Sequence, residues 1–269
     1  MAFVYLFLFL FGLIVGSFLN VLVLRTSSGE NLKGRSRCFS CLKKLSWLDL
    51  FPVVSFLSIR GRCRYCGSKI SWQYPIVELM SGIIFVSVAW VMMPALPDLL
   101  GLVRYLLVVA FFSMLLAISV YDIRHKIIPD SFSIALFVFV AILEGIHIYE
   151  QWGFVGATWF SDVIAGVGAF SFFGGLWLAS RGKWMGLGDA KIAISIGLLL
   201  GFPGVLFGLL ISFWVGALYG LSMMALHRYS RKSEVPFAPF LAIGAYATFF
   251  IISTDALMVL YRYLGLYGV

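Results

Sequence analysis

The first 24 residues of the chain carry no charged side chain, and this run constrains the fold more than any other feature of the sequence. An α-helix needs ~20 predominantly apolar residues to cross the hydrocarbon core of a bilayer. The run has that length, lacks a basic stretch before its apolar part and has no clear small-residue cleavage site at its end. We therefore expect residues 1–24 to form a retained first transmembrane helix rather than a removed signal peptide.

Further apolar segments follow the first, and the composition agrees with a membrane protein. The chain is 62% hydrophobic and only 12% charged, whereas soluble domains are roughly a quarter charged. We therefore expect an all-α polytopic membrane protein with about eight transmembrane helices. The later spans are predicted at 75–93, 102–120, 131–149, 162–180, 185–201, 204–226 and 237–261.

Basic residues divide unevenly between the loops that this helix count creates. With the N-terminus outside, 18 of the 20 Lys and Arg residues fall in cytoplasmic loops, and only Arg104 and Arg262 remain outside. Short cytoplasmic loops of membrane proteins are enriched in Lys and Arg, so we expect both termini outside. The net charge of +8 then reflects topology and contact with acidic membrane lipid, and it calls for no nucleic acid partner.

The long polar segment 25–74 contains all four cysteines, in two CxxC pairs with 21 residues between them. Two CxxC pairs at such a separation are typical of zinc sites with four thiolate ligands. A site with four protein ligands has no open position, so the metal is expected to be structural. Two disulfides and four free thiols are the alternatives, although disulfides seldom persist in the cytoplasm. The predicted zinc ligands are Cys38, Cys41, Cys63 and Cys66.

Two acidic residues lie at predicted helix ends on the cytoplasmic side. Asp122 follows the third helix, and Asp189 ends a Gly-Leu-Gly-Asp run at the start of the sixth. Two carboxyl groups that share a site cannot both ionise readily, so one keeps its proton. The ionised group can then activate a water while the protonated group polarises a carbonyl. We predict that Asp122 and Asp189 form the catalytic pair of an intramembrane aspartic peptidase.

Alternatives remain open for these acids. Either aspartate alone is equally compatible with a solvated charge at the membrane interface, and GxGD is a weak pattern by itself. Asp130 is expected to cap the fourth helix and is the second choice for the first catalytic acid. Glu144, inside the fourth helix, has no assigned role. The glycines before Asp189 are expected to permit close backbone approach and an unwound turn.

Other chemistries and functions find less support. No HExxH or GxSxG motif is present, and His125, His147 and His227 are isolated from one another. We therefore do not expect a histidine-based metal site. A transporter that uses the two aspartates as proton or cation ligands is one alternative function, although transporters tend to show internal repeats and midplane charges. A non-catalytic membrane scaffold built around the zinc loop is another.

These motifs, in order along nearly the whole chain, resemble the type IV prepilin leader peptidases, which also process type II secretion pseudopilins. The resemblance implies that Asp122 and Asp189 are the catalytic aspartates. It also implies a prepilin substrate, cut after a glycine at the cytoplasmic edge of its hydrophobic segment. The matching segments are 16–21, the two CxxC pairs, 60–67 with 70–71, 74–79, Asp122, 128–130, 186–191 and 235–240.

The resemblance further implies a second activity. Many members methylate the new N-terminal amine with S-adenosylmethionine, an activity associated with the N-terminal half and the cysteine loop. Gly61 and Arg62 match a position linked to methylation, with Arg62 where Lys is frequent, and Glu78 is a further candidate. Ala238 stands where the family often has glycine. The expected regions, in a bacterial inner membrane, are the first helix 1–24, the zinc-ribbon-like loop 25–74 and the peptidase bundle 75–269.

Overall fold

The computed structural model describes residues 2–29, 31, 34–93, 98–151, 159–228, 230 and 234–254. These described residues form helices and connecting loops and contain no β-strand. Packing divides the chain into two units, Met1–Gly101 and Leu102–Val269. The elements are α1 (Ala2–Ser28), the 3-10 helix η1 (Trp47–Leu50), α2 (Val54–Ser58), α3 (Gln73–Met92), α4 (Leu99–His125), α5 (Asp130–Gln151), α6 (Trp159–Ser180), α7 (Leu187–Leu200), α8 (Gly204–Ala225) and α9 (Ala238–Ser253).

The helix lengths confirm an all-α polytopic membrane fold. Within the described part of the chain, six helices are long and apolar enough to cross a bilayer, namely α1, α3, α4, α5, α6 and α8. The predicted count of eight is approximate, because α7 has 14 residues and α9 has 16, whereas a full span needs ~20. The end of the span predicted at 237–261 lies outside the described residues.

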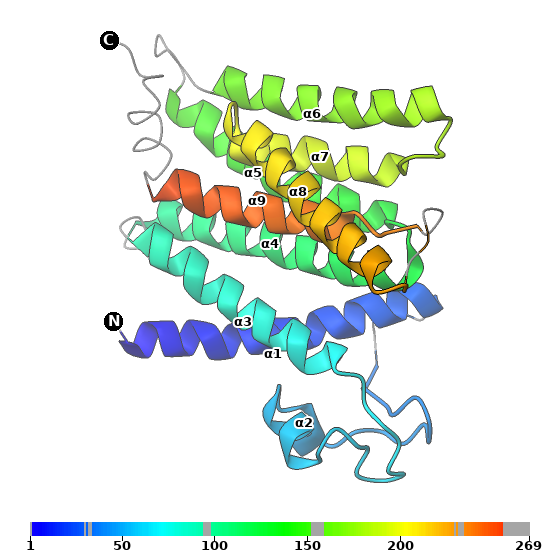
Figure 1. Cartoon of the computed structure of the whole chain (residues 1–269). Coiled ribbons are helices and arrows are strands. Elements are labelled where there is room, and N and C mark those ends of the chain that lie inside the picture. The colour runs from blue at the N-terminus through cyan, green and yellow to red at the C-terminus, as the bar shows by residue number, and fades with distance from the viewer. Residues whose placement is uncertain are drawn as a thin grey trace. The chain divides into compact units, whose positions relative to one another are not determined.

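In the first unit, α1 and α3 pack along each other, in blue and cyan in Figure 1. Two glycines of α1 make this approach possible. A Cβ on Gly12 would lie 2.7 Å from the Cα of Gly82, and a Cβ on Gly16 would lie 2.6 Å from the Cα of Glu78. Small residues at such positions let the backbones of membrane helices come close together.

A buried polar network fixes the start of α3 against α1. Asn20 is 1% exposed. Its Nδ2 donates to the carbonyl oxygens of Gly16 and Tyr74, and its Oδ1 accepts from Nε2 of Gln73, the first residue of α3. Buried polar groups need such partners. The packing of α1 against α3 is therefore sufficient to explain why the motif at 16–21 contains Asn20.

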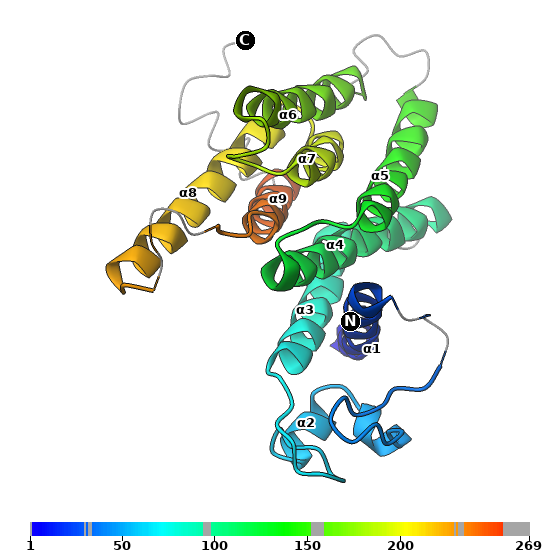
Figure 2. The same cartoon turned by 90° about the vertical axis from the view of Figure 1, so that its right-hand side faces the viewer.

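In the second unit, α7 is the central helix. It packs against α5, α6, α8 and α9, and Figure 2 shows it between α5, α6 and α9. The closest of these contacts involves Gly197, where a Cβ would lie 2.6 Å from the carbonyl oxygen of Ala165 and 2.6 Å from the Cα of Gly166. The position of this short helix is therefore set by its protein neighbours.

Candidate active site and metal centre

Asp122 lies in the last turn of α4 and is 5% exposed. The helix continues past its predicted end at residue 120 to His125. It is closed by Lys126, which has a φ of 54° and donates its N–H to the Asp122 carbonyl oxygen at 2.8 Å. The Asp122 side chain points to the start of α9, where the N–H of Ala238 donates to Oδ2 at 3.1 Å. A backbone hydrogen bond thus orients this carboxyl group.

Asp189 lies in the first turn of α7 and is 7% exposed. The N-terminus of a helix favours negative charge. Gly188 brings this turn against the loop after α4, because a Cβ there would lie 2.9 Å from the Cβ of Ile128. This contact is with a side chain, so the expected close approach of a second backbone stays a prediction. The expected unwound turn is present at Gly186, which is extended, but does not reach Gly188. Since α7 begins at Leu187, both Gly188 and Asp189 are helical.

The two acids come from helices that are remote in sequence but end in the same part of the second unit. Asp122 lies in the last turn of α4, and the loop that follows this turn contacts the first turn of α7, which carries Asp189, through Ile128 and Gly188. Both are buried within the bundle, where charge is poorly solvated. The structure thus brings together the two acids predicted from the sequence, and their catalytic roles stay predictions.

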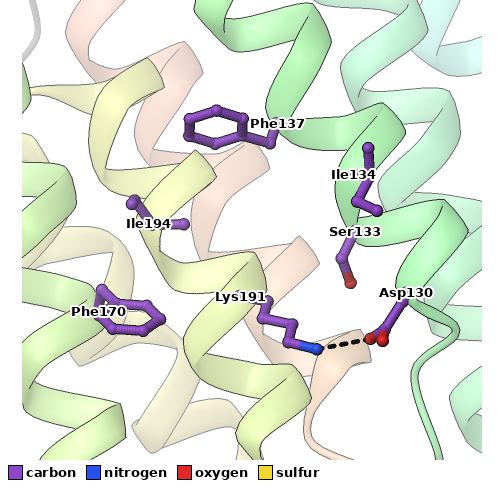
Figure 3. Close-up of a pocket in the computed structure, with 7 residues that line it drawn as sticks. All are labelled: Asp130, Ser133, Ile134, Phe137, Phe170, Lys191 and Ile194. Atoms are coloured by element: carbon purple, nitrogen blue, oxygen red, sulfur yellow. Dashed lines mark hydrogen bonds and ion pairs between the residues drawn. The ribbon is translucent and has the colours of Figure 1, made fainter.

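Asp130 differs from this pair in exposure and in partner. It is the first residue of α5, its side chain is 72% exposed, and its Oδ1 lies 2.6 Å from Nζ of Lys191. Because it engages a cation rather than a second carboxyl group, Asp130 is a weaker candidate than Asp122 for the catalytic pair. The ion pair borders an open pocket of about 260 Å³ (Figure 3). The pocket is lined by Asp130, Ser133, Ile134, Phe137, Phe170, Lys191 and Ile194.

The four cysteines converge in the loop of the first unit. Their Sγ atoms all lie within 4.8 Å of one another, and those of Cys38 and Cys66 are 3.9 Å apart. Tetrahedral zinc with Zn–S bonds of ~2.3 Å separates its sulfur ligands by about 3.8 Å. All four cysteines are free, and the separation far exceeds the ~2.05 Å of a disulfide bond. The donor set therefore fits a structural zinc ion.

The two CxxC pairs share one backbone form. In each pair the N–H of the first cysteine donates to the carbonyl five residues later, at 3.0 Å for Cys38 and 2.8 Å for Cys63. In each pair the residue after the second cysteine has a positive φ, 57° at Leu42 and 71° at Gly67. This local symmetry presents the sulfur atoms of both pairs to a common centre.

Hydrogen bonds favour the thiolate at some of these ligands. The N–H of Cys41 lowers the pKa of the Cys38 thiol to about 6, and Ser68 lowers the pKa of Cys66. The N–H of Lys43 lowers the pKa of Cys41, but desolvation and the adjacent sulfur atoms outweigh it and raise the pKa to about 11. A metal cation removes this mutual repulsion because it binds all the sulfurs as thiolates.

Asp49 anchors the second CxxC pair to η1, and the sequence patterns did not single it out. Its Oδ2 accepts from the Ser46 hydroxyl at 2.7 Å and the Tyr65 hydroxyl at 3.2 Å, and its Oδ1 lies 3.0 Å from Nε of Arg64. Burial raises the pKa of Asp49, but the Ser46 and Tyr65 hydrogen bonds and the Arg64 charge outweigh it and lower that pKa. In the sequence, the signal that could have identified Asp49 is that it is an acid within a strongly basic loop.

The residues linked to methyl transfer take part in the fold of this loop. Gly61 has a φ of 66°, and a Cβ there would lie 3.0 Å from the Phe56 ring. Glu78 is 6% exposed and accepts the N–H of Val53, just before α2, at 2.7 Å. Arg62 belongs to an isolated β-bridge. These contacts give Gly61 and Glu78 a structural role that needs no cofactor. Their role in methyl transfer therefore stays a prediction.

Two family models match the chain. Residues 10–92 match the bacterial peptidase A24 N-terminal domain, and residues 109–221 match the type IV leader peptidase family. The cysteine cluster falls in the first match, and both Asp122 and Asp189 fall in the second. No solved structure matches the chain.

Curated relatives are similar to the chain over most of its length. A prepilin leader peptidase/N-methyltransferase of Bacillus subtilis is 29% identical over 245 residues, which cover 88% of this chain and 90% of the relative. A protein of the same name from Xanthomonas campestris is 30% identical over 268 residues, covering 89% and 88%. Another from Klebsiella pneumoniae is 32% identical over 213 residues, covering 74% and 86%.

Proposed function

The chain belongs to the type IV leader peptidase family, and from this premise we propose that it cleaves the leader peptides of type IV prepilins or pseudopilins. The observation that carries the proposal is the pair of buried acids, Asp122 and Asp189, which lie at helix ends joined by the Ile128–Gly188 contact and within the peptidase match. Family membership gives no support to the transporter alternative.

Hydrolysis by this pair needs one ionised and one protonated carboxyl group. The ionised group takes a proton from a water, whose oxygen bonds to the carbonyl carbon of the scissile peptide, while the protonated group donates to the carbonyl oxygen. One carboxyl group then protonates the amide nitrogen, the other takes back a hydroxyl proton, and the C–N bond breaks. Repulsion between like charges in a poorly solvated site keeps the pair at a single negative charge.

Backbone groups support the position of both acids. The N–H of Ala238 restrains the carboxyl group of Asp122, and the contact of Gly188 with Ile128 holds the first turn of α7 against the loop after α4. Catalytic groups held in position before the reaction avoid the entropy loss of finding their geometry. These contacts favour a working catalytic pair over two independent surface charges.

We assign the pocket of Figure 3 to the apolar segment of the substrate. Its wall combines aliphatic and aromatic side chains of α5, α6 and α7, and its polar end is the ion pair of Lys191 with Asp130. Lys191 follows Asp189 by two residues on α7, so the pocket lies at the same end of that helix as Asp189, on a different face. A prepilin joins an apolar helix to a charged leader, which matches this change from apolar to charged lining.

Cleavage of a purified prepilin by the full chain in detergent tests the proposal. Asp122→Asn and Asp189→Asn should each abolish the mobility shift of the substrate, and N-terminal sequencing should locate the cut in the wild-type reaction. Asp130→Asn should raise KM more than it lowers kcat, because Asp130 lies at the pocket and outside the pair. Glu150→Gln, at the other end of α5, should leave both constants unchanged. Full activity in either Asn variant of the pair would contradict the proposal.

We further propose that the first unit supports N-methylation of the cleaved substrate. The N-terminal family match and the names of the curated relatives support this second activity. Zinc on the four cysteines would order the loop that carries Gly61 and Arg62, and S-adenosylmethionine would supply the methyl group. With labelled S-adenosylmethionine and a cleaved pilin, Arg62→Ala should lose methyl transfer and keep cleavage. Lys69→Ala, a basic control in the same loop, should keep both.

We also propose an inner-membrane location with both termini outside. The concentration of Lys and Arg in the loops after the first, third, fifth and seventh predicted helices supports this orientation. Arg104, expected on the outer side, pairs with Glu150 near the end of α5, at the opposite end of that helix from Asp130. Reporter fusions at the loops 121–130 and 94–98 should report opposite sides of the membrane, and the same side for both would contradict the topology.

A further inference from the structure

Three potential metal ligands meet in the second unit, away from the catalytic pair. Glu144 and His147 belong to α5, and Asp162 lies in the first turn of α6. Each offers one ligand atom, and the three atoms lie within 4.8 Å of one another. Nδ1 of His147 is 3.2 Å from Oδ2 of Asp162 and 3.9 Å from Oε2 of Glu144. From the sequence, the histidines were compared only with one another, and carboxylates were not recognised as their partners.

This cluster is remote from Asp122 and Asp189. Asp130, at the start of α5, pairs with Lys191 beside the catalytic pair, and His147 lies 17 residues further along the same helix. At ~1.5 Å per residue this is about 25 Å. A peptide bond held at the catalytic pair cannot reach the cluster, so the cluster has no direct part in hydrolysis.

The cluster places two carboxyl groups beside one imidazole in a poorly solvated part of the bundle. The side chains of Glu144 and Asp162 are 13% and 15% exposed. Oε2 of Glu144 is shielded from solvent and has no hydrogen-bond partner in the described structure, because 3.9 Å from His147 is too long for a hydrogen bond. A buried acceptor without a donor is costly, and a cation would remove that cost.

The donor atoms and their spacing suit a divalent transition metal. Imidazole and carboxylate together bind Zn²⁺ or Mn²⁺. Metal–ligand bonds of ~2.0–2.2 Å separate neighbouring ligand atoms by about 2.8–3.1 Å in an octahedral site and about 3.3–3.6 Å in a tetrahedral site. The His147–Asp162 distance of 3.2 Å lies between these two ranges, and Glu144 would have to move its oxygen slightly closer. Gly201, with a φ of 61°, leaves room for Asp162, because a Cβ there would overlap Oδ1.

We propose that Glu144, His147 and Asp162 bind a divalent metal ion of the Zn²⁺ or Mn²⁺ class, with water in the remaining positions, and that the ion ties the end of α5 to the start of α6. Since α6 packs along α7, which carries Asp189, the ion stabilises the support of the catalytic helix. A ligand that binds only the folded state raises its stability.

Manganese distinguishes this site from the cysteine cluster, because carboxylate and imidazole accept Mn²⁺ whereas thiolates favour softer ions. The full chain, purified in detergent with zinc on its cysteines, is titrated with Mn²⁺, and free Mn²⁺ is followed by electron paramagnetic resonance. Wild type should bind one Mn²⁺ per chain, and Asp162→Asn and Glu144→Gln should lose this binding. Glu150→Gln is the matched control, since Glu150 is an acid on the same part of α5 that pairs with Arg104.

Thermal unfolding gives a second readout. Mn²⁺ should raise the midpoint of wild type and of Glu150→Gln, and leave that of Asp162→Asn unchanged, while retained prepilin cleavage shows that each variant is folded. Equal Mn²⁺ binding by wild type and Asp162→Asn would overturn the proposal, as would loss of binding on Cys66→Ser. Absence of Mn²⁺ binding by wild type that holds one zinc per chain would also overturn it, because the cysteines account for that zinc and the second site would then be empty of both ions.

Discussion

The cysteine loop of the first unit and the catalytic end of the second unit hold polar groups in place by different means. Between residues 34 and 72 only Phe56 and Cys63 are buried, so the loop has almost no apolar core. Asp122 and Asp189, in contrast, are 5% and 7% exposed and are held within packed helices. We expect metal coordination by the cysteines to supply in the loop the order that side-chain packing supplies in the bundle.

This contrast implies that the two regions fail separately. A small polar segment cannot bury enough surface to fold by itself, so loss of its metal should disorder the loop and leave the helices intact. Loss of one carboxyl group in the bundle removes a charge and preserves the packing, so it should stop the chemistry and leave the loop folded. The changes below test this separation.

The largest effect is expected from the catalytic pair. Asp122→Asn and Asp189→Asn should each lower the rate of prepilin cleavage by about 10²–10⁴-fold, because each removes a group that moves a proton. The double variant should be no slower than the slower single variant, since the two acids act as a unit. Rates and zinc content should be measured on the same samples. A variant that also loses zinc would break the separation of the two regions.

Loss of the zinc ligands should give the next largest effect. Structural zinc contributes ~10–16 kcal/mol to the folding of zinc-finger peptides, so Cys41→Ser and Cys66→Ser should release the metal and expose the basic loop to trypsin. Methyl transfer should fall to background while prepilin cleavage keeps most of its rate. Ser40→Ala, inside the first CxxC pair, is the control and should keep its zinc. Cleavage lost as completely as in Asp122→Asn would argue that the loop belongs to the peptidase site.

A smaller effect is expected where α6 meets α7. Gly197→Ala forces a Cβ against the backbone of Ala165 and Gly166 and should destabilise the second unit by about 1–3 kcal/mol. Cleavage should slow because α7 carries Asp189, and the zinc content should not change. Gly168→Ala in α6 meets no atom within 4 Å and should be neutral or stabilise by up to about 1 kcal/mol. Thermal midpoints of the two variants provide the comparison, and equal shifts would contradict the packing argument.

The smallest effect concerns Asp49 in the loop. Because hydrogen bonds and Arg64 lower its pKa in the folded loop, Asp49 stabilises the loop above its ordinary pKa, and this stabilisation is lost as pH falls through the lowered pKa. Asp49→Asn should cost about 1 kcal/mol and speed the transfer of zinc to a chelator at neutral pH. Tyr65→Phe removes one hydrogen bond and should have a smaller effect. Identical transfer rates in wild type and Asp49→Asn would show that Asp49 is not an anchor.

Local sequence patterns predicted the elements of the fold well, but they did not predict the contacts between these elements. The uncharged run at the start of the chain forms α1, and the CxxC spacing brought the four cysteines together, since both depend on neighbouring residues. The end of α4 was placed too early because charged residues follow Val120, whereas the helix is closed only at Lys126. The pairing of Lys191 with Asp130 and the contacts of Asp49 with Arg64 and Tyr65 depend on partners distant in the sequence, whereas the contact of Asp49 with Ser46 is local.

The sequence by itself determined the membrane class, the grouping of the cysteines and the two acids in the peptidase match, because apolar length, ligand spacing and short motifs are local properties. Only the tertiary structure decided that Ala238 orients Asp122, that Gly188 and Gly197 place α7, and that Glu144 and His147 meet Asp162. Each of these contacts joins two segments that are distant in the sequence. Their geometry follows from how closely helix backbones can approach, which depends on the packed shape of both partners and cannot be read from either one alone.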